Sequence, residues 1–164
     1  MADNEHAMAG GGPGIPAQGS APADPWDALE HEMVVLLRRA RSISEDSARM
    51  VDPTLGAAAY GLLLRIDDQG AARAKELSDF FGLDKSTISR QISLLEELGL
   101  IDREPDPLDG RARRLILTER GRERVHAART RRRVNFRSRV DDWDRDDVAL
   151  LAQLLGRLNA LYAG

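Results

Sequence analysis

The chain has 164 residues, of which 42% are hydrophobic and 31% charged, a composition typical of one globular domain of ordinary size. It contains no cysteine, which excludes disulfides, thiolate metal sites and thiol redox switches and fits a cytoplasmic location. The formal net charge is −3, yet residues 70–139 hold 17 Lys and Arg against 11 Asp and Glu, a local balance of +6. This asymmetry indicates either a surface that binds a polyanion or a set of internal ion pairs.

The N-terminal part of the chain predicts a tail followed by two helices. Residues 1–24 are rich in Gly and Pro and nearly free of large apolar side chains, so we expect a disordered tail without a signal peptide. A first helix is predicted from Asp24 to about Ser47, because an N-cap aspartate is followed by proline and apolar residues recur at helical spacing. The sequence "DPT" at 52–54 has the same pattern and predicts the start of a second helix, which ends at "DDQG".

A short helix and a longer one, joined by a tight turn, are predicted in the middle of the chain. The short helix, "RAKELSDFF" over 73–81, stops at Gly82. The longer helix, over 84–99, begins with the N-cap residue Asp84, and Gly99 is placed to end it in the left-handed conformation. These signals place a helix, a tight turn and a capped helix in succession.

Two strands and two more helices complete the predicted order. The strands lie at 100–105 and 113–118, and the Pro and Asp-Gly residues between them are a strong hairpin signal. Thr118 caps a long helix through about Arg139, which is broken by "DDWDRDD". Apolar residues over 148–162 mark a final helix.

The predicted helix over 84–99 has two contrasting faces. Its apolar side chains share one face, while the opposite face carries small hydroxyls and one arginine instead of the Glu and Lys mixture of an ordinary solvated helix. Short hydroxyl side chains allow close approach of a helix to a surface, and arginine can donate two hydrogen bonds to guanine. The pattern is typical of a recognition helix in the DNA major groove, although a surface helix rich in serine would share it. The candidate major-groove residues are Lys85, Ser86, Ser89, Arg90 and Ser93.

The turn between the predicted strands, "DPLDGRARR", is interpreted as the tip of a β-wing. Asp109 and Arg111 lie two residues apart, so we expect both to project to the same side, with the carboxylate orienting the guanidinium. An arginine on a hairpin tip fits the narrow minor groove, where the negative potential is enhanced. The alternative is a solvent-exposed ion pair worth at most about 1 kcal/mol. The candidate wing residues are Asp109, Arg111 and Arg113.

From about Asp52 to Gly121 the chain resembles the winged helix-turn-helix of the MarR family of bacterial transcriptional regulators. The matching stretches are "KELSDFFGLDKSTISRQISLLEELGLI" and "DPLDGRARRLILTERG". The second reproduces the family's D-x-R wing, followed by a strand that ends in Leu-Thr and a glycine. One departure is Arg73 at the start of the short helix, where the family usually has a capping Ser or Thr.

The resemblance implies an obligate homodimer that binds double-stranded DNA. The first and last two helices of its protomers interlock, and the two winged modules occupy successive major-groove faces of a pseudo-palindrome. Independently of the resemblance, the final helix has apolar side chains on more than half of its circumference, which favours a partner chain over burial within the monomer. By resemblance, Ser86, Ser89, Arg90 and Ser93 face the major groove, Arg111 enters the minor groove, and Asp109 orients it.

The predicted fold is mostly α (α+β), a winged helix-turn-helix with flanking dimerisation helices. No internal repeat is visible. The predicted divisions are a disordered tail at 1–24, an N-terminal dimerisation helix at 25–51, a winged helix-turn-helix DNA-binding domain at 52–120, and C-terminal dimerisation helices at 121–164.

The arginine-rich segment "RTRRRVNFRSR" at 129–139 has two interpretations. In the first, its arginines pair, as part of a dimer interface, with the aspartates of "DDWDRDD" at 141–147 or with the acidic first helix. In the second, they contact DNA phosphates. The first is favoured, because a helix that leads away from the wing should carry these residues off the DNA. Arg120, Arg122 and Arg124, nearer the wing, are better candidates for phosphate contacts.

The sequence indicates a regulator and not an enzyme. Its three histidines are scattered, no Gly-rich phosphate loop follows a strand, and no His, Asp or Glu cluster has metal-ligand spacing, so we expect no metal or cofactor. We expect sequence-specific DNA binding and repression, with release by a small effector as the resemblance implies. Trp26, Tyr60 and Arg65 are candidates to line the effector's crevice, although core packing explains the first two equally well.

Two other classes of protein remain open at this point. An architectural nucleic-acid binder predicts similar affinity for random and specific duplexes and a steep salt dependence. A helical interaction protein, whose winged module contacts another protein, predicts no loss of function for Arg90→Ala or Arg111→Ala. No membrane partner is expected, since the most apolar stretch is too short to span a bilayer.

Overall fold

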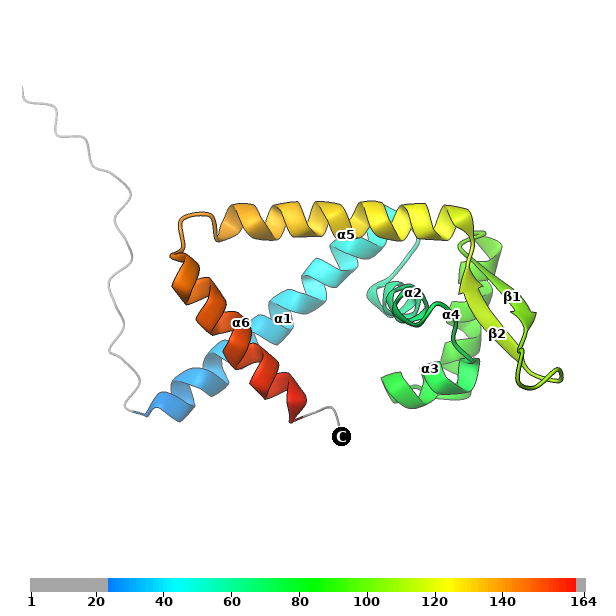
Figure 1. Cartoon of the computed structure of the whole chain (residues 1–164), viewed down its shortest axis with the longest axis horizontal. Helices are drawn as coiled ribbons and strands as arrows, with labels where there is room; N and C mark the ends of the chain where they lie inside the picture. The colour runs from blue at the N-terminus through cyan, green and yellow to red at the C-terminus, as the bar shows by residue number, and fades with distance from the viewer. Residues whose placement is uncertain (1–23, 162–164) are drawn as a thin grey trace, which may run out of the picture. The chain divides into compact units, whose positions relative to one another are not determined.

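A computed structural model describes residues 24–161 as a mostly helical chain with one small antiparallel sheet (Figure 1). The predicted α+β class is confirmed, whereas the predicted tail at 1–24 lies outside the described residues except for its last residue. The chain divides into two compact units between Arg38 and Arg39, within the first helix. The elements are α1 (Pro25–Val51), α2 (Ala57–Gln69), α3 (Ala74–Phe81), α4 (Lys85–Glu97), β1 (Ile101–Pro105), β2 (Arg113–Leu117), α5 (Glu119–Arg139) and α6 (Arg145–Ala160).

Helix α1 begins where the sequence predicts but ends at Val51 and not near Ser47. The carboxylate of Asp24 accepts the backbone N–H of Trp26 at 2.9 Å, the kind of interaction that fixes a helix start. The helix continues because Ser47, Ala48 and Val51 are all buried against the core of the second unit. Tertiary packing therefore sets this end of the helix.

The prediction that "DPT" at 52–54 starts the second helix is wrong. Asp52 closes a local turn, because its Oδ1 accepts the backbone N–H of Thr54 at 2.9 Å and the Thr54 hydroxyl at 2.6 Å. Those two hydrogen bonds lower the pKa of the Asp52 carboxyl. Helix α2 begins at Ala57, whose N–H donates to the carboxylate of Glu45 at 3.2 Å. The group that caps α2 thus comes from α1 and not from the local sequence.

Helices α3 and α4 follow one another across a tight turn, as predicted (Figure 1). The turn passes through Gly82 at φ 61°, a left-handed conformation that glycine adopts without strain. Ser78 of α3 closes it on both sides: its carbonyl accepts the N–H of Leu83 at 3.2 Å, and its hydroxyl donates to the Leu83 carbonyl at 2.6 Å. The chain therefore enters α4 in a fixed direction.

Strands β1 and β2 form the predicted hairpin and are joined to the residues before α3. They pair antiparallel, with Arg103 opposite Leu115 at the centre. Ala72 adds a bridge on the other side of β2, because its N–H donates to the Leu115 carbonyl at 3.0 Å and its carbonyl accepts the Leu115 N–H at 2.8 Å. The hairpin is thereby attached by backbone hydrogen bonds to the start of the helix-turn-helix.

The start of helix α5 is hydrogen-bonded to Gly99 and Leu100, the residues that precede β1. Thr118 caps the helix, as predicted, by accepting the N–H of Gly121 at 2.9 Å. Its own N–H donates to the Leu100 carbonyl at 3.1 Å, and its hydroxyl donates to the Gly99 carbonyl at 2.8 Å. A Cβ atom added to Gly121 would lie 2.0 Å from the Leu100 carbonyl oxygen, so only glycine permits this close approach.

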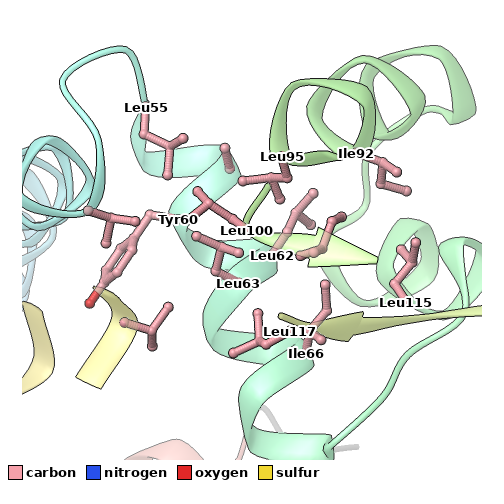
Figure 2. Packing of buried hydrophobic residues seen from close by; sticks show 14 of the residues in the cluster. Leu55, Tyr60, Leu62, Leu63, Ile66, Ile92, Leu95, Leu100, Leu115 and Leu117 are labelled. Atoms are coloured by element: carbon pink, nitrogen blue, oxygen red, sulfur yellow. The ribbon is translucent and has the colours of Figure 1, made fainter. Parts of the chain in front are cut away.

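Within the second unit, one apolar core joins α2, α3, α4 and both strands to the adjoining parts of α1 and α5 (Figure 2). Helix α2 lies at its centre and buries residues on several sides, including Tyr60, Leu63 and Ile66. Leu95 of α4 and Leu115 of β2 pack in the same cluster, together with the C-terminal part of α1 and the first half of α5. The helix-turn-helix, the hairpin and the start of α5 therefore share one core.

The two terminal helices expose apolar side chains. Helix α6 has no buried residue and ends at Ala160, while Tyr162, the last residue of the predicted helix, lies outside the described residues. No helix in the described part of the chain is long and apolar enough to cross a membrane. The exposed large apolar residues of these helices are Trp26, Leu29, Val34, Leu36, Leu37 and Ile43 in α1 and Val148, Leu150, Leu151 and Leu154 in α6.

Candidate nucleic-acid interface

Helix α4 is fixed at its N-terminus by one carboxylate. Asp84 Oδ1 accepts the hydroxyl of Ser86 at 2.5 Å and the backbone N–H of Thr87 at 2.9 Å, while Oδ2 accepts the Thr87 hydroxyl at 2.6 Å. The hydrogen bonds from Ser86 and Thr87 hold the pKa of the Asp84 carboxyl well below its usual range, so the cap is ionised at neutral pH. Along the face of α4 that packs on the protein, Ile88 and Ile92 are buried in the core. The helix is therefore anchored at its end and along one face.

The structure places all of the predicted major-groove residues on the exposed side of α4. The Ser86 hydroxyl is engaged by the cap, whereas the hydroxyls of Ser89 and Ser93 form no hydrogen bond with another described residue. Arg90 reaches only the Thr87 hydroxyl, at a long 3.4 Å, and enters no ion pair within residues 24–161. The outer face thus presents two hydroxyls and two cations, from Lys85 and Arg90, that are free to meet a ligand.

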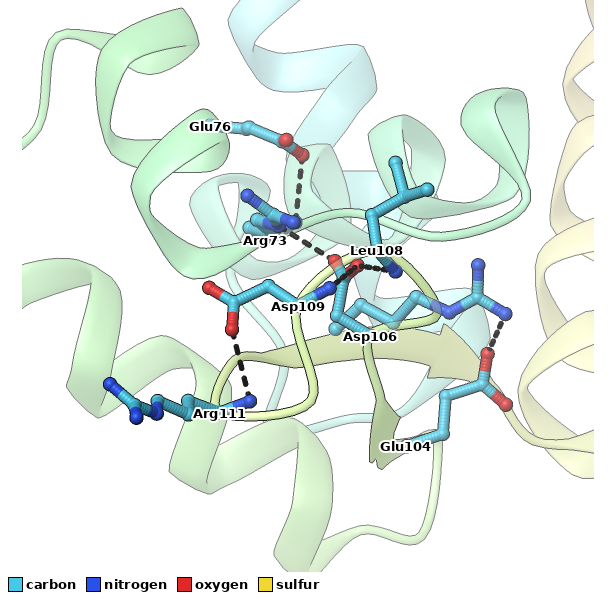
Figure 3. A network of polar contacts seen from close by, with 8 residues as sticks. Arg73, Glu76, Glu104, Asp106, Leu108, Asp109 and Arg111 are labelled. Atoms are coloured by element: carbon cyan, nitrogen blue, oxygen red, sulfur yellow. Dashed lines mark hydrogen bonds and ion pairs between the residues drawn. The ribbon is translucent and has the colours of Figure 1, made fainter.

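The hairpin carries Arg113 at the start of β2 and Arg111 in the turn, two residues after Asp109. The Asp109 carboxylate accepts the backbone N–H of Arg111 at 3.0 Å and makes no ion pair with the Arg111 guanidinium (Figure 3). Asp109 therefore shapes the turn, because its short side chain reaches the backbone two residues on more readily than the end of a long side chain. Arg111 and Arg113 are both exposed, and neither forms an ion pair within the described residues.

Lower in the hairpin, arginines are paired. Arg114 forms an ion pair with Glu104, directly opposite it in the register of the two strands. Arg103 makes two hydrogen bonds to the carboxylate of Glu96, at 2.5 and 3.1 Å, which joins β1 to α4 and raises the pKa of the arginine. The unpaired cations of the hairpin are thus concentrated toward its tip.

The carboxylate that organises the tip, Asp106, was not among the residues predicted from the sequence. Asp106 is only 8% exposed, and its Oδ1 accepts the backbone N–H groups of Leu108 at 2.8 Å and Asp109 at 3.2 Å. Its Oδ2 accepts Nε of Arg73 at 2.7 Å (Figure 3). The hydrogen bond from Arg73 and then that from Leu108 lower the pKa of Asp106 to about 2. The signals were an Asp-Pro pair in the turn and an arginine where a capping Ser or Thr is usual.

The arginines of α5 differ in their availability. Arg122 is engaged, because it pairs with Glu119 at 2.9 Å and donates to the Leu117 carbonyl at 2.8 Å, which weakens it as a candidate for phosphate contact. Arg120 and Arg124 are exposed and form no ion pair in the described part of the chain. Their positive charges contribute to lowering the pKa of Asp52, which places them on the side of α5 that faces the turn before α2.

The arginine-rich segment at 129–139 does not pair with the aspartates of 141–147 in residues 24–161. Arg129 instead forms ion pairs with the end of α2, at 2.9 Å from Asp67 and 2.6 Å from Asp68. The other arginines of the segment are exposed. Pairing with these aspartates across a dimer interface stays a prediction. In the described residues, no group of three or more His, Asp or Glu side chains could hold a metal ion.

The winged helix-turn-helix geometry is matched by known proteins. A family model described as MarR family matches residues 54–112. The uncharacterized HTH-type transcriptional regulator YxaD of Bacillus subtilis (strain 168) is 32% identical, over 85% of this chain and 96% of that protein. The chain belongs to the MarR family.

Solved structures agree with this MarR-family fold. RV1404 from Mycobacterium tuberculosis superposes with a TM-score of 0.72 at 23% identity, covering 85% of this chain and 95% of that one. The regulator Tm0710 from Thermotoga maritima has a TM-score of 0.57 at 27% identity, covering 80% and 94%. The apo form of wild-type MarR from E. coli has a TM-score of 0.68 at 20% identity, covering 84% and 98%. As a member of the MarR family, the chain is a DNA-binding transcriptional regulator.

Proposed function

We propose that this MarR-family regulator reads an operator with α4 in the major groove and the tip of the β1–β2 hairpin at the minor groove. The observation that carries the proposal is the outer face of α4, where Ser89, Arg90 and Ser93 are exposed and uncommitted on a helix fixed by its cap and its buried face. Arginine can discriminate guanine by two hydrogen bonds, and serine hydroxyls can donate to or accept from bases or phosphates. A rigid helix of this kind suits direct readout of bases.

The unpaired arginines at the hairpin tip support a minor-groove contact. Arg111 is exposed in a turn whose backbone is held by the Asp106 and Asp109 carboxylates, and Arg113 is exposed at the start of β2. A guanidinium on such a turn can enter a narrow minor groove, where the negative potential is strongest. Arg120 and Arg124 are proposed to contact phosphates, since phosphate contacts position a protein on the duplex without reading its sequence.

We propose that the chain works as a homodimer that pairs through α1 and α6. Within α6, Leu150, Leu151 and Leu154 are 39–54% exposed, and the first part of α1 exposes a further set that includes Trp26 at 74%. A soluble chain seldom leaves so many large apolar side chains in water unless a partner covers them. A second copy is the fitting partner, because a two-fold dimer would present two copies of α4 to half-sites about 34 Å apart.

We further propose that the regulator is a repressor that a small effector releases. Two hollows of about 400 and 420 Å³ border α5, one lined in part by Asp67 and His126 and the other by Met50 and Asn135. Both are open surface hollows whose volumes lie within the range of small-molecule sites. Tyr60 is packed in the core, which leaves it no place in such a site. An effector that favours a dimer with the wrong distance between its α4 helices would weaken operator binding.

Selection of bound duplexes from a random pool tests this function directly. A palindromic consensus with half-sites one helical turn apart is expected, and Arg90→Ala should cost about 1–3 kcal/mol on that consensus and relax the preference at one base pair. Arg49→Gln, which removes a cation paired with Asp46 on α1, is the control and should bind as wild type does. Equal binding of random and selected duplexes would favour an architectural binder, and unchanged binding by both Arg90→Ala and Arg111→Ala would favour a protein-interaction module.

A further inference from the structure

The tip of the hairpin has one tie to the remainder of the protein. Within the described residues, the hydrogen bonds of residues 106–112 close on the hairpin itself, except the one that Asp106 accepts from Arg73. A two-stranded hairpin on its own is marginally stable in water, so its tip needs an outside contact to keep one position. The contact is a short, charge-assisted hydrogen bond of 2.7 Å to the only charged side chain that is buried in this part of the chain.

Arg73 is itself held at the start of the helix-turn-helix. It occupies the N-cap position of α3, where its backbone N–H donates to the carboxylate of Glu76 at 2.8 Å (Figure 3). The preceding residue, Ala72, is bonded in both directions to Leu115 of β2. The backbone of Arg73 is therefore fixed, and its side chain extends from that fixed point to Asp106, 33 residues further along the chain.

We propose that Arg73 and Asp106 form a clamp that sets the position of the hairpin tip relative to α3 and α4, and that Arg73 is thereby a positioning residue for DNA binding. Asp106 transmits the position, because the same carboxylate that accepts Arg73 also accepts the N–H groups of Leu108 and Asp109. Breaking the clamp releases the segment that carries Arg111. The proposal rests on the proposed function, in which that arginine lies at the minor groove.

A direct contact between Arg73 and a DNA phosphate is the competing explanation, since the Arg73 side chain is 38% exposed. The two explanations differ in what they predict for Asp106, which is buried and negatively charged and so has no favourable contact with a phosphate. In a clamp the two residues act as one unit, so losing either should cost the same and losing both should cost no more. If Arg73 binds phosphate, only its own loss should matter.

The test combines operator affinity with hydrogen exchange of the free protein. Affinity for the selected duplex is measured by fluorescence anisotropy for Arg73→Gln, Asp106→Asn and the double variant, beside Arg73→Lys and the control Arg49→Gln. We expect each single variant to bind about tenfold more weakly, the double variant no more weakly than either, and Arg73→Lys to regain most of the affinity. In the free protein, the amides of Leu108 and Asp109 should exchange faster in Arg73→Gln, while the core amide of Leu63 remains protected.

The results distinguish a failure of the Arg73–Asp106 clamp from a failure of the proposed minor-groove contact. Unchanged exchange of the Leu108 and Asp109 amides in Arg73→Gln overturns the clamp, as does full affinity of Asp106→Asn. If Arg111→Ala binds as wild type does, the minor-groove contact is refuted, whatever the exchange experiment shows about the clamp. A loss of protection at Leu63 would identify general unfolding and would also overturn the specific role given to Arg73.

Discussion

Gly121→Ala should destabilise the protein, although the same change usually stabilises a helix. Gly121 lies in the first turn of α5, where alanine has a propensity advantage of about 1 kcal/mol over glycine. Against this, the added methyl group would lie 2.0 Å from the Leu100 carbonyl oxygen and 3.0 Å from its carbon. Carbon–oxygen contacts settle at about 3.3–3.6 Å, so one of the two backbone segments must move by more than about 1 Å.

The size of the effect follows from what that movement breaks. Overpacking commonly costs about 1–3 kcal/mol, and neither partner here is a flexible side chain that can turn aside. The shift also strains the hydrogen bond from Thr118 N–H to the Leu100 carbonyl and the one from its hydroxyl to Gly99. Because both partners are backbone, we take the upper end of that range, about 3 kcal/mol, and subtracting the propensity gain of about 1 kcal/mol leaves a net loss of about 2 kcal/mol. For a chain of this length that corresponds to a fall in Tm of about 4–8 °C.

Thermal unfolding followed by circular dichroism provides the assay, with all variants at one protein concentration because dimerisation would shift the Tm. Glu123→Ala is the matched control, since it places alanine at an exposed position of the same helix and should change stability by no more than about 0.5 kcal/mol. A Tm of Gly121→Ala equal to or above that of wild type would mean that helix propensity prevails and would refute the close packing of α5 on Leu100.

Three further predictions concern charge and assembly. The Arg73 guanidinium and nearby backbone N–H groups lower the pKa of Asp106 from 3.8 to about 2, so its stabilising effect is present above pH 3.8 and is lost as the pH falls toward 2. Urea unfolding over this range should show a smaller loss for Asp106→Asn than for wild type, and parallel losses would contradict the assignment. Arg129→Met removes the ion pairs with Asp67 and Asp68 and should lower the free energy of unfolding by about 1 kcal/mol or less at low salt. At about 1 M salt the loss should be smaller still, because salt screens the pairs. A loss that salt does not change would indicate packing instead. Leu151→Asp should yield a monomer by light scattering, and a persistent dimer would exclude α6 from the interface.

The order of the elements could be predicted from sequence because their boundaries are set by local chemistry. Asp84 and Thr118 cap helices through hydrogen bonds to residues three positions away, and Gly99 ends α4 at φ 64°. The exposed face of α4 followed from the helical period alone. Each of these signals lies within one turn of the feature that it determines, so a single sequence contains all the information needed.

The features that were missed depend on contacts between distant residues. The start of α2 is capped by Glu45 from α1, and the end of α1 is set by burial. The hydrogen bond that the Asp109 carboxylate accepts from the backbone N–H of Arg111 was not predicted, because the sequence pointed to the Arg111 side chain as its partner. The bond between Arg73 and Asp106 joins positions whose proximity depends on the pairing of Ala72 with β2. Spacing along the chain gives no measure of such proximity.

The backbone bridge at Ala72 has a practical consequence for redesign. The residues of the wing are not continuous in sequence, since Ala72, which pairs with β2, precedes α3. A chimera that grafts a foreign hairpin onto this scaffold must therefore import the donor's equivalents of residues 72–73 along with residues 101–117. Grafts confined to the hairpin would leave β2, which lies between β1 and Ala72, with a mismatched neighbour.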